Sequence, residues 1–230
     1  LRAAGHAADG VRLMAIGSPL AGKARLLREL GASTSGVALT EFAFSLPILM
    51  SLLLCGLEVS NFALAHLRVN QIAMTVADNA GRVRTTMDES NVYEVFSGAD
   101  VTGQSIDFTA HGRIVLSSLQ DNGKTGSLAG QVINWQRCYG SLNINPSYGR
   151  QDAGRNDASL AAGLGRTGNK ITAAPNTAVM FVEVTYDYQP LISNRMFGPS
   201  RIRYESAFNV RERTNQNITN TQSLAVKTCP

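Results

Sequence analysis

A continuous apolar stretch at residues 37–57 constrains this chain more than any other feature of its sequence. The stretch contains 21 residues, Glu41 is its only charged side chain, and residues 42–57 carry no charge. At about 1.5 Å of helix rise per residue it spans about 31 Å, close to the ~30 Å hydrocarbon core of a bilayer. The sequence therefore favours a single membrane-spanning helix, with its membrane part at about residues 40–60, over a buried helix of a soluble protein.

Most of the excess positive charge lies just before this stretch. The chain has a formal net charge of +4, and residues 1–36 contribute five Lys or Arg and two Asp or Glu, a net of +3. Because basic flanks are retained in the cytoplasm, we expect residues 1–36 to be a basic cytoplasmic leader and the C-terminal part to lie outside. No basic patch interleaved with aromatic residues indicates a nucleic-acid partner.

Two common kinds of exported N-terminus fit the sequence less well. A signal peptide could end at Ala63-Leu64-Ala65, with cleavage before His66, but Glu58 and Asn61 then lie between the apolar run and the cleavage site. A lipoprotein site at Cys55 is excluded, because Leu54 stands where a small residue is required.

The residues around Gly36 match a third kind of N-terminus. The segment "SGVALTEF" resembles a prepilin processing site, where a dedicated peptidase on the cytoplasmic face cuts after glycine. The wider stretch 36–81 is similar to the N-terminal pattern of the TadE-like family, through Gly36, Thr40 to Ala43, Pro47 and Glu58. Further along, "VINWQRCYG" and "VEVTYDYQPL" resemble C-terminal features of the same family.

This resemblance implies a pseudopilin or minor pilin of the tight-adherence (Flp-type) type IV pilus. It implies cleavage between Gly36 and Val37, so that Glu41 becomes the fifth mature residue and pairs with a neighbouring subunit's terminal amine. The implied partners are the inner membrane, the prepilin peptidase, other pilin-like subunits and the pilus assembly platform. The leader is long for a prepilin and the sequence begins with Leu1, so we expect translation to start at Met14 or at an upstream codon. On the alternative reading, Glu41 only marks the interfacial end of an ordinary anchor.

The helical pattern continues past the apolar stretch. Apolar residues recur there at spacings of three and four, with one polar member, at Val59, Phe62, His66, Val69, Ala73, Val76, Ala80 and Val83. We therefore predict a transmembrane and extended pilin-like helix over residues 37–84, which contains Phe42, Pro47, Leu57 and Glu58. We expect this apolar stripe to pack on other subunits, on the chain's own sheet, or on both. Pro47 removes one backbone hydrogen bond and is expected to kink or loosen the helix.

Residues 85–230 are expected to form a periplasmic domain, so that the fold class is α+β with the long helix packed on a small, mostly antiparallel sheet. Strand-like runs rich in β-branched and aromatic residues occur at Ser105–Phe108, Arg113–Ser118, Gly130–Gln136, Ala178–Tyr188 and Arg201–Val210. The last two are expected to form a hairpin.

Two features outside these runs also carry expectations. Residues 140–177 form a polar insertion with at most one short helix, at Ala158–Leu164. The adjacent acids Asp88 and Glu89 follow the long helix and are expected to be solvated.

Cysteine placement favours one disulfide in an oxidising compartment. Cys55 lies inside the apolar run, whereas Cys138 and Cys229 both belong to the outer domain. We predict a Cys138–Cys229 bridge rather than two free thiols.

The sequence contains no catalytic constellation. Its three histidines are scattered, and "GLGRTG" at residues 163–168 lacks the strand and helix that a dinucleotide-binding fingerprint requires. We expect no enzymatic activity, no cofactor and no metal. The alternative to a pilin-like protein is an unprocessed single-pass envelope protein with a periplasmic ligand- or partner-binding domain.

Overall fold

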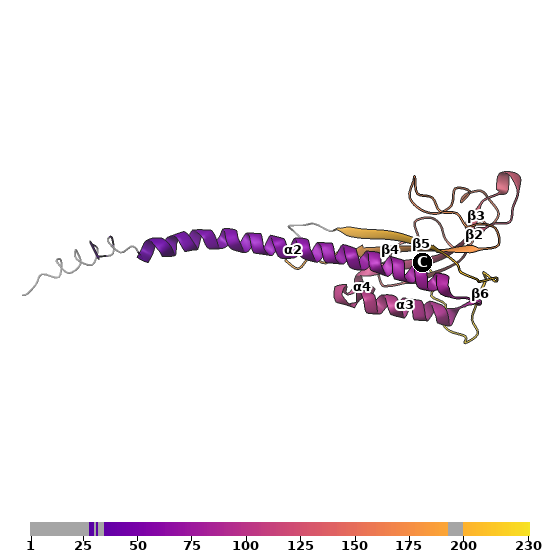
Figure 1. The fold of residues 1–230 in the computed structure, drawn as a ribbon, viewed down its shortest axis with the longest axis horizontal. Helices are drawn as coiled ribbons and strands as arrows, with labels where there is room; N and C mark the ends of the chain where they lie inside the picture. Colours follow the sequence, from indigo (N-terminus) through magenta and orange to yellow (C-terminus); the bar gives the residue numbers. More distant parts are fainter. Residues whose placement is uncertain (1–27, 30, 32–34, 193–199) are drawn as a thin grey trace, which may run out of the picture. The chain divides into compact units, whose positions relative to one another are not determined.

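The computed structural model describes residues 28, 29, 31, 35–192 and 200–230. It has an α+β fold in which a long helix and a four-stranded sheet are the main elements (Figure 1). The chain divides into two compact units, Leu1–Leu53 and Leu54–Pro230. The basic leader lies almost wholly outside the described residues.

The long helix α2 runs from Ser35 to Arg82, which confirms the predicted helix, and it continues through Pro47. In the second unit its inward face is fully buried, at Val69, Ile72, Ala73, Val76, Ala77 and Ala80. Most of the predicted stripe is therefore part of the domain's own core. Val59 differs, because its side chain is exposed.

The sheet contains β2 (Gly112–Asp121), β3 (Gln131–Tyr139), β4 (Ala178–Asp187) and β5 (Arg201–Asn209). The strand order is β3-β2-β4-β5, and every neighbouring pair is antiparallel. Four of the five predicted strands are thus confirmed, as is the pairing of β4 with β5. A second, two-stranded sheet pairs β1 (Met87–Asp88) with β6 (Ile218–Thr219) in parallel.

The prediction of a strand at Ser105–Phe108 is wrong. These residues belong to the short helices η1 (Gln104–Ile106) and α4 (Phe108–His111), separated by Asp107 in the left-handed region with φ 48°. The fully buried ring of Phe108 explains this turn, because it fills the space that side chains at Gly103 and Gly112 would otherwise occupy.

A helix that the sequence reasoning overlooked, α3 (Glu89–Gly103), follows β1 directly. Asp88 caps its N-terminus by accepting a hydrogen bond from the Ser90 N–H at 3.1 Å, and the Asn91 side chain accepts one from the Asp88 N–H at 3.1 Å. The expectation that Asp88 and Glu89 are solvated is therefore wrong. Both are buried, Asp88 as a cap and Glu89 as the partner of a buried arginine.

The two faces of the sheet are covered by different parts of the chain. One face packs against α2 and α3 through alternate residues of β4 such as Met180, Val182 and Val184. The other face packs against the polar insertion, where Phe181 and Leu119 meet Leu160, Leu164 and Ala173. A β-bulge with Asn134 as the extra residue of β3 lets Trp135 face the helices while Ile133 faces the insertion.

The insertion at residues 140–177 covers one face of the sheet with tight turns, and the one short helix that the sequence allowed at Ala158–Leu164 does not form. These residues form turns that end in an isolated bridge between Leu164 and Ile171. Gly163 has a φ of 82°, and a Cβ there would lie 2.0 Å from the Ile171 carbonyl oxygen. The chain therefore leaves the helical region at this glycine.

Candidate functional site

The first half of α2 presents an unbroken exposed surface. Every residue from 36 to 57 is exposed, including Gly36, Val37, Glu41 and Phe42. The Gly36–Val37 peptide bond lies in the first turn of α2, and Glu41 lies about one turn further on. Among the described residues, α2 is the helix long and apolar enough to span a membrane, and only 6% of its most apolar window is buried. A core helix of a soluble protein would be mostly buried instead.

The three hydroxyl side chains of this exposed segment make hydrogen bonds within the helix. The hydroxyls of Thr40, Ser45 and Ser51 each donate to a carbonyl three residues earlier, at 2.8–3.1 Å. A hydroxyl bonded to its own helix does not need water, so it can enter a hydrocarbon environment at low cost.

Glu58, the residue after Leu57, is the first buried residue of α2 from Gly36 onward. Its side chain is only 1% exposed and accepts hydrogen bonds from the Tyr188 hydroxyl at 2.6 Å and from the Leu191 and Ile192 N–H groups at 3.0 and 3.2 Å. These donors, all uncharged, come from the loop that follows β4. Glu58 therefore attaches the start of the β4–β5 loop to α2.

Tyr188 reinforces this junction between helix and sheet. Its hydroxyl also accepts a hydrogen bond from the Asn61 side chain at 2.8 Å, and its ring packs edge-on against Phe62. Burial, together with the hydrogen bond to Glu58, raises the pKa of the Tyr188 phenol to about 12. The phenol is therefore neutral at physiological pH and acts as a donor to the carboxylate.

The turn of α2 that contains His66 also joins the helix to the sheet. His66 packs edge-on against Phe62, and its Nδ1 lies 3.1 Å from the Tyr204 hydroxyl. It contributes to the packing of α2 on β5.

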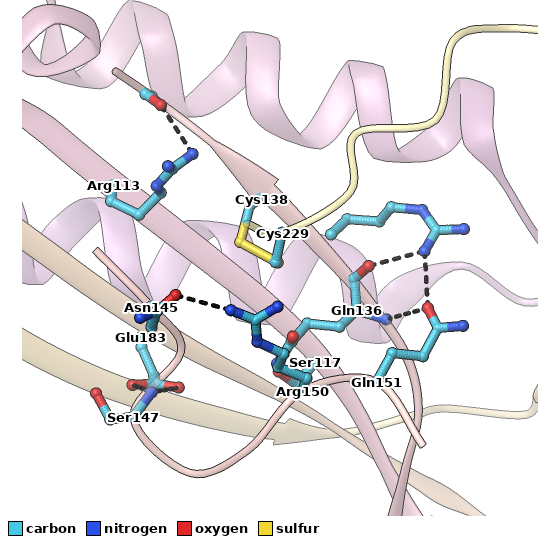
Figure 2. The surroundings of a disulfide bond; sticks show 12 residues. Arg113, Ser117, Gln136, Cys138, Asn145, Ser147, Arg150, Gln151, Glu183 and Cys229 are labelled. Carbon is cyan, nitrogen blue, oxygen red and sulfur yellow. Dashed lines mark hydrogen bonds between the residues drawn. A yellow bond between two sulfur atoms is a disulfide. The ribbon is translucent and has the colours of Figure 1, made fainter. Parts of the chain in front are cut away.

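The predicted disulfide joins Cys138 of β3 to Cys229 in the C-terminal segment, with a Cα–Cα distance of 4.9 Å (Figure 2). The segment also pairs with β3 directly, since the Cys138 N–H donates to the Lys227 carbonyl at 2.8 Å. The Lys227 ammonium lies 4.3 Å from the centre of the Tyr93 ring in α3. Cys55 is a free, exposed thiol in α2.

Beside the disulfide, a buried ion pair joins three parts of the domain. The Arg137 guanidinium donates to Glu89 Oε1 of α3, at 2.7 Å from Nε, and to the Gln151 side chain of the insertion at 3.3 Å. Figure 2 shows Gln136 and Gln151 next to the bridge. The pair thus ties the helical layer, β3 and the insertion together.

Asp88 holds the start of the C-terminal segment as well as capping α3. Its carboxylate accepts hydrogen bonds from the Thr221 N–H at 2.9 Å and the Thr219 hydroxyl at 2.8 Å. The backbone bonds from Thr221 and Ser90, followed by the Thr219 hydroxyl, hold the pKa of Asp88 well below its ordinary value.

We expect the Asp88→Asn variant to be less stable than the wild type at neutral pH and to approach it in acid. A depressed folded-state pKa contributes stability that is fully present above the unfolded pKa of about 3.9 and is lost as the pH falls toward the folded value. Urea unfolding at pH 7, 4 and 3 measures the difference. A gap between the two proteins that stays constant over this range would contradict the role of the Asp88 charge.

Sequence reasoning singled out Glu58 but not its partners. The family pattern includes Glu58, yet Tyr188, Leu191 and Ile192 lie more than 120 residues further along the chain. It also missed the pair of Glu89 and Arg137. One signal was available for the pair, because Arg137 stands directly before Cys138, which was predicted to form a disulfide.

Comparison of the chain with protein-family models, with curated proteins and with solved structures finds no match.

Proposed function

We propose that this chain is a TadE-like pseudopilin or minor pilin, a structural component of a tight-adherence pilus with no catalytic role. The observation that carries the proposal is the two-part use of α2. Its first half exposes an apolar surface of membrane-spanning length, and its second half is the core of a disulfide-bridged α+β domain. This division between a lipid-facing segment and a domain core suits a subunit that is stored in the inner membrane before assembly.

The positive charges before the apolar segment support an orientation with the domain outside the cytoplasm. Lys23, Arg25 and Arg28 precede it, which favours a cytoplasmic N-terminus. The Cys138–Cys229 disulfide supports an oxidising location for the domain, as expected for the periplasm.

Glu41 suits a role in processing and assembly because its carboxylate is exposed near the start of the helix. A lone carboxylate near the hydrocarbon region is costly and gains most from a cation. Cleavage after Gly36 creates such a cation, the terminal amine of Val37. A neighbouring subunit can then supply the amine that neutralises Glu41.

The outward face of α2 provides a second assembly surface. Leu57, Leu64, Leu67 and Met74 are exposed and follow spacings of seven and three, as the a and d positions of a helical seam do. This seam lies apart from the buried stripe of α2. It is therefore available for packing against the helices of other subunits.

Two rival readings of the N-terminus remain as outcomes of the test. Cleavage before His66 would remove Glu58 and cut beside Ala65, which is buried on the sheet, whereas proteolysis favours exposed loops. An unprocessed single-pass envelope protein would retain its original start.

The test compares the wild type with the Glu41→Ala variant in cells that carry a tight-adherence system. Mass spectrometry of the membrane-extracted wild-type protein is expected to give the mass of a chain that begins at Val37. The variant is expected to remain in the membrane fraction and to be lost from sheared pili, because no carboxylate recruits the neighbouring amine. Glu94→Ala removes an exposed glutamate of α3 and serves as the matched control, with normal assembly.

A mature chain that begins at His66 would support signal-peptide cleavage, and an uncut chain would support the envelope-protein alternative. Normal assembly of the Glu41→Ala variant would contradict the proposed role of the carboxylate.

A further inference from the structure

The β4–β5 loop carries two exposed apolar side chains, at Leu191 and Ile192, although their backbone is fixed. Leu191 is 68% exposed and Ile192 is 37% exposed. The N–H groups of both residues donate to the buried carboxylate of Glu58. This part of the loop is therefore held against α2, while its two apolar side chains are exposed.

The hydrogen bonds to Glu58 fix the position of Leu191 and Ile192 along the axis of α2. Glu58 follows directly after Leu57, the last residue of the apolar stretch 37–57. Helical side chains incline toward the helix N-terminus, so the Glu58 carboxylate and the loop bound to it lie within about one turn, ~5 Å, of the end of that stretch. If the stretch fills the bilayer core, Leu191 and Ile192 lie at the boundary between acyl chains and headgroups.

The charges near the loop suit this boundary. The nearest carboxylate of β4, Asp187, accepts two hydrogen bonds from the Arg201 guanidinium, at 2.6 and 3.1 Å. Its negative charge is thus compensated within the hairpin. A compensated charge adds less repulsion at an anionic membrane surface than an unpaired carboxylate would.

We propose that Leu191 and Ile192 insert into the interfacial layer of the bilayer, on the side of the domain, as a second lipid contact beside α2. This inference rests on the proposed function in one respect, since it requires α2 to span the membrane. Glu58 is then a positioning residue that keeps the loop at the depth of the interface, and the occupant of the exposed apolar surface is phospholipid.

The register of the sheet supplies an internal control. Tyr186 pairs with Gly112 at the end of the sheet that carries the loop, whereas Ala178 pairs with Gln120 at the opposite end. Leu128 lies in the β2–β3 connection at that opposite end and is 47% exposed. At about 3.3 Å per strand residue it is displaced by roughly 25–30 Å along the sheet from the loop.

The experiment uses the full chain with Cys55→Ser, so that the disulfide leaves a single introduced cysteine for labelling. Leu191→Cys, Leu128→Cys and Ile48→Cys, all at exposed positions, each receive an environment-sensitive fluorophore. The proteins are reconstituted in vesicles of phosphatidylethanolamine and phosphatidylglycerol that contain lipids with a nitroxide near the headgroup or near the chain end. The Leu191 substitution leaves its hydrogen bond to Glu58 intact, because the backbone N–H donates it.

We expect the probe at position 191 to lose about half of its emission or more with the shallow nitroxide and less with the deep one. The probe at position 48 should respond most to the deep nitroxide, and the probe at position 128 to neither. Quenching at position 48 without quenching at position 191 would overturn this inference and leave the membrane span standing. Absence of quenching at both would overturn the membrane span as well. A blue-shifted but unquenched probe at position 191 would indicate a second copy of the chain as the occupant and would likewise overturn the lipid contact.

Discussion

Replacing Glu89 by alanine is expected to lower the free energy of unfolding by about 3–5 kcal/mol, because it leaves the buried Arg137 guanidinium without its counter-charge. Both side chains are buried, so water cannot replace the lost carboxylate. The effect should extend beyond α3, since Arg137 also binds the Gln151 side chain of the insertion.

The chain contains its own probe and a suitable control for this measurement. Trp135, the single tryptophan, is buried in β3 two residues from Arg137, so urea unfolding of the detergent-solubilised chain can be followed by its fluorescence. Arg84→Ala breaks the exposed ion pair with Glu212 and should cost less than about 1 kcal/mol.

A double variant separates the loss of the pair from a loss of packing. Replacing Glu89 by methionine together with Arg137 by leucine removes both charges and keeps apolar volume, so it should recover much of the stability lost in Glu89→Ala. Equal destabilisation by Glu89→Ala and Arg84→Ala would show that the pair contributes little.

The long helix and the sheet were predictable because each has a strong periodic signal. The apolar stretch 37–57 exceeds what a short buried helix needs, and β4 is a run of β-branched and aromatic residues closed by Pro190. Helix α3 has a weaker signal. Its buried residues Val92, Val95, Phe96 and Ala99 follow helical spacing, but Gly98 and several Ser, Asn and Thr residues lower its intrinsic helix propensity. Packing on α2 and the N-terminal cap at Asp88 compensate for this low helix propensity.

The contacts around Glu58 and Glu89 could not be predicted for a different reason. Each depends on the meeting of segments distant in sequence, such as Glu58 with Leu191 and Glu89 with Arg137. The sequence around a glutamate that follows an apolar run does not reveal whether its carboxylate is exposed to water or accepts hydrogen bonds from buried groups. The tertiary fold decides this, because it brings the loop that follows β4 beside Glu58 of α2.

The disulfide was predictable by elimination, since the apolar run contains one of the three cysteines. Its energetic weight depends on what else holds the C-terminal segment. Asp88 binds Thr219 and Thr221, and the Tyr93 hydroxyl donates to the Ala225 carbonyl at 2.8 Å. These contacts keep the segment close to the domain even without the bridge, so loss of the bridge alone should not unfold the sheet.

Replacing Cys138 and Cys229 by serine together is expected to lower the free energy of unfolding by about 2–4 kcal/mol, because the bridge closes a loop across a separation of 91 residues in the unfolded chain. Urea unfolding of the variant, and of the wild type with and without reductant, measures this loss. Cys55→Ser should leave stability unchanged because Cys55 is exposed and unbridged. Alkylation of the unreduced, denatured wild type should modify only Cys55, whereas modification of all three cysteines would contradict the bridge. A serine variant as stable as the wild type would contradict this prediction, because the native contacts at Asp88 and Tyr93 are present in both proteins.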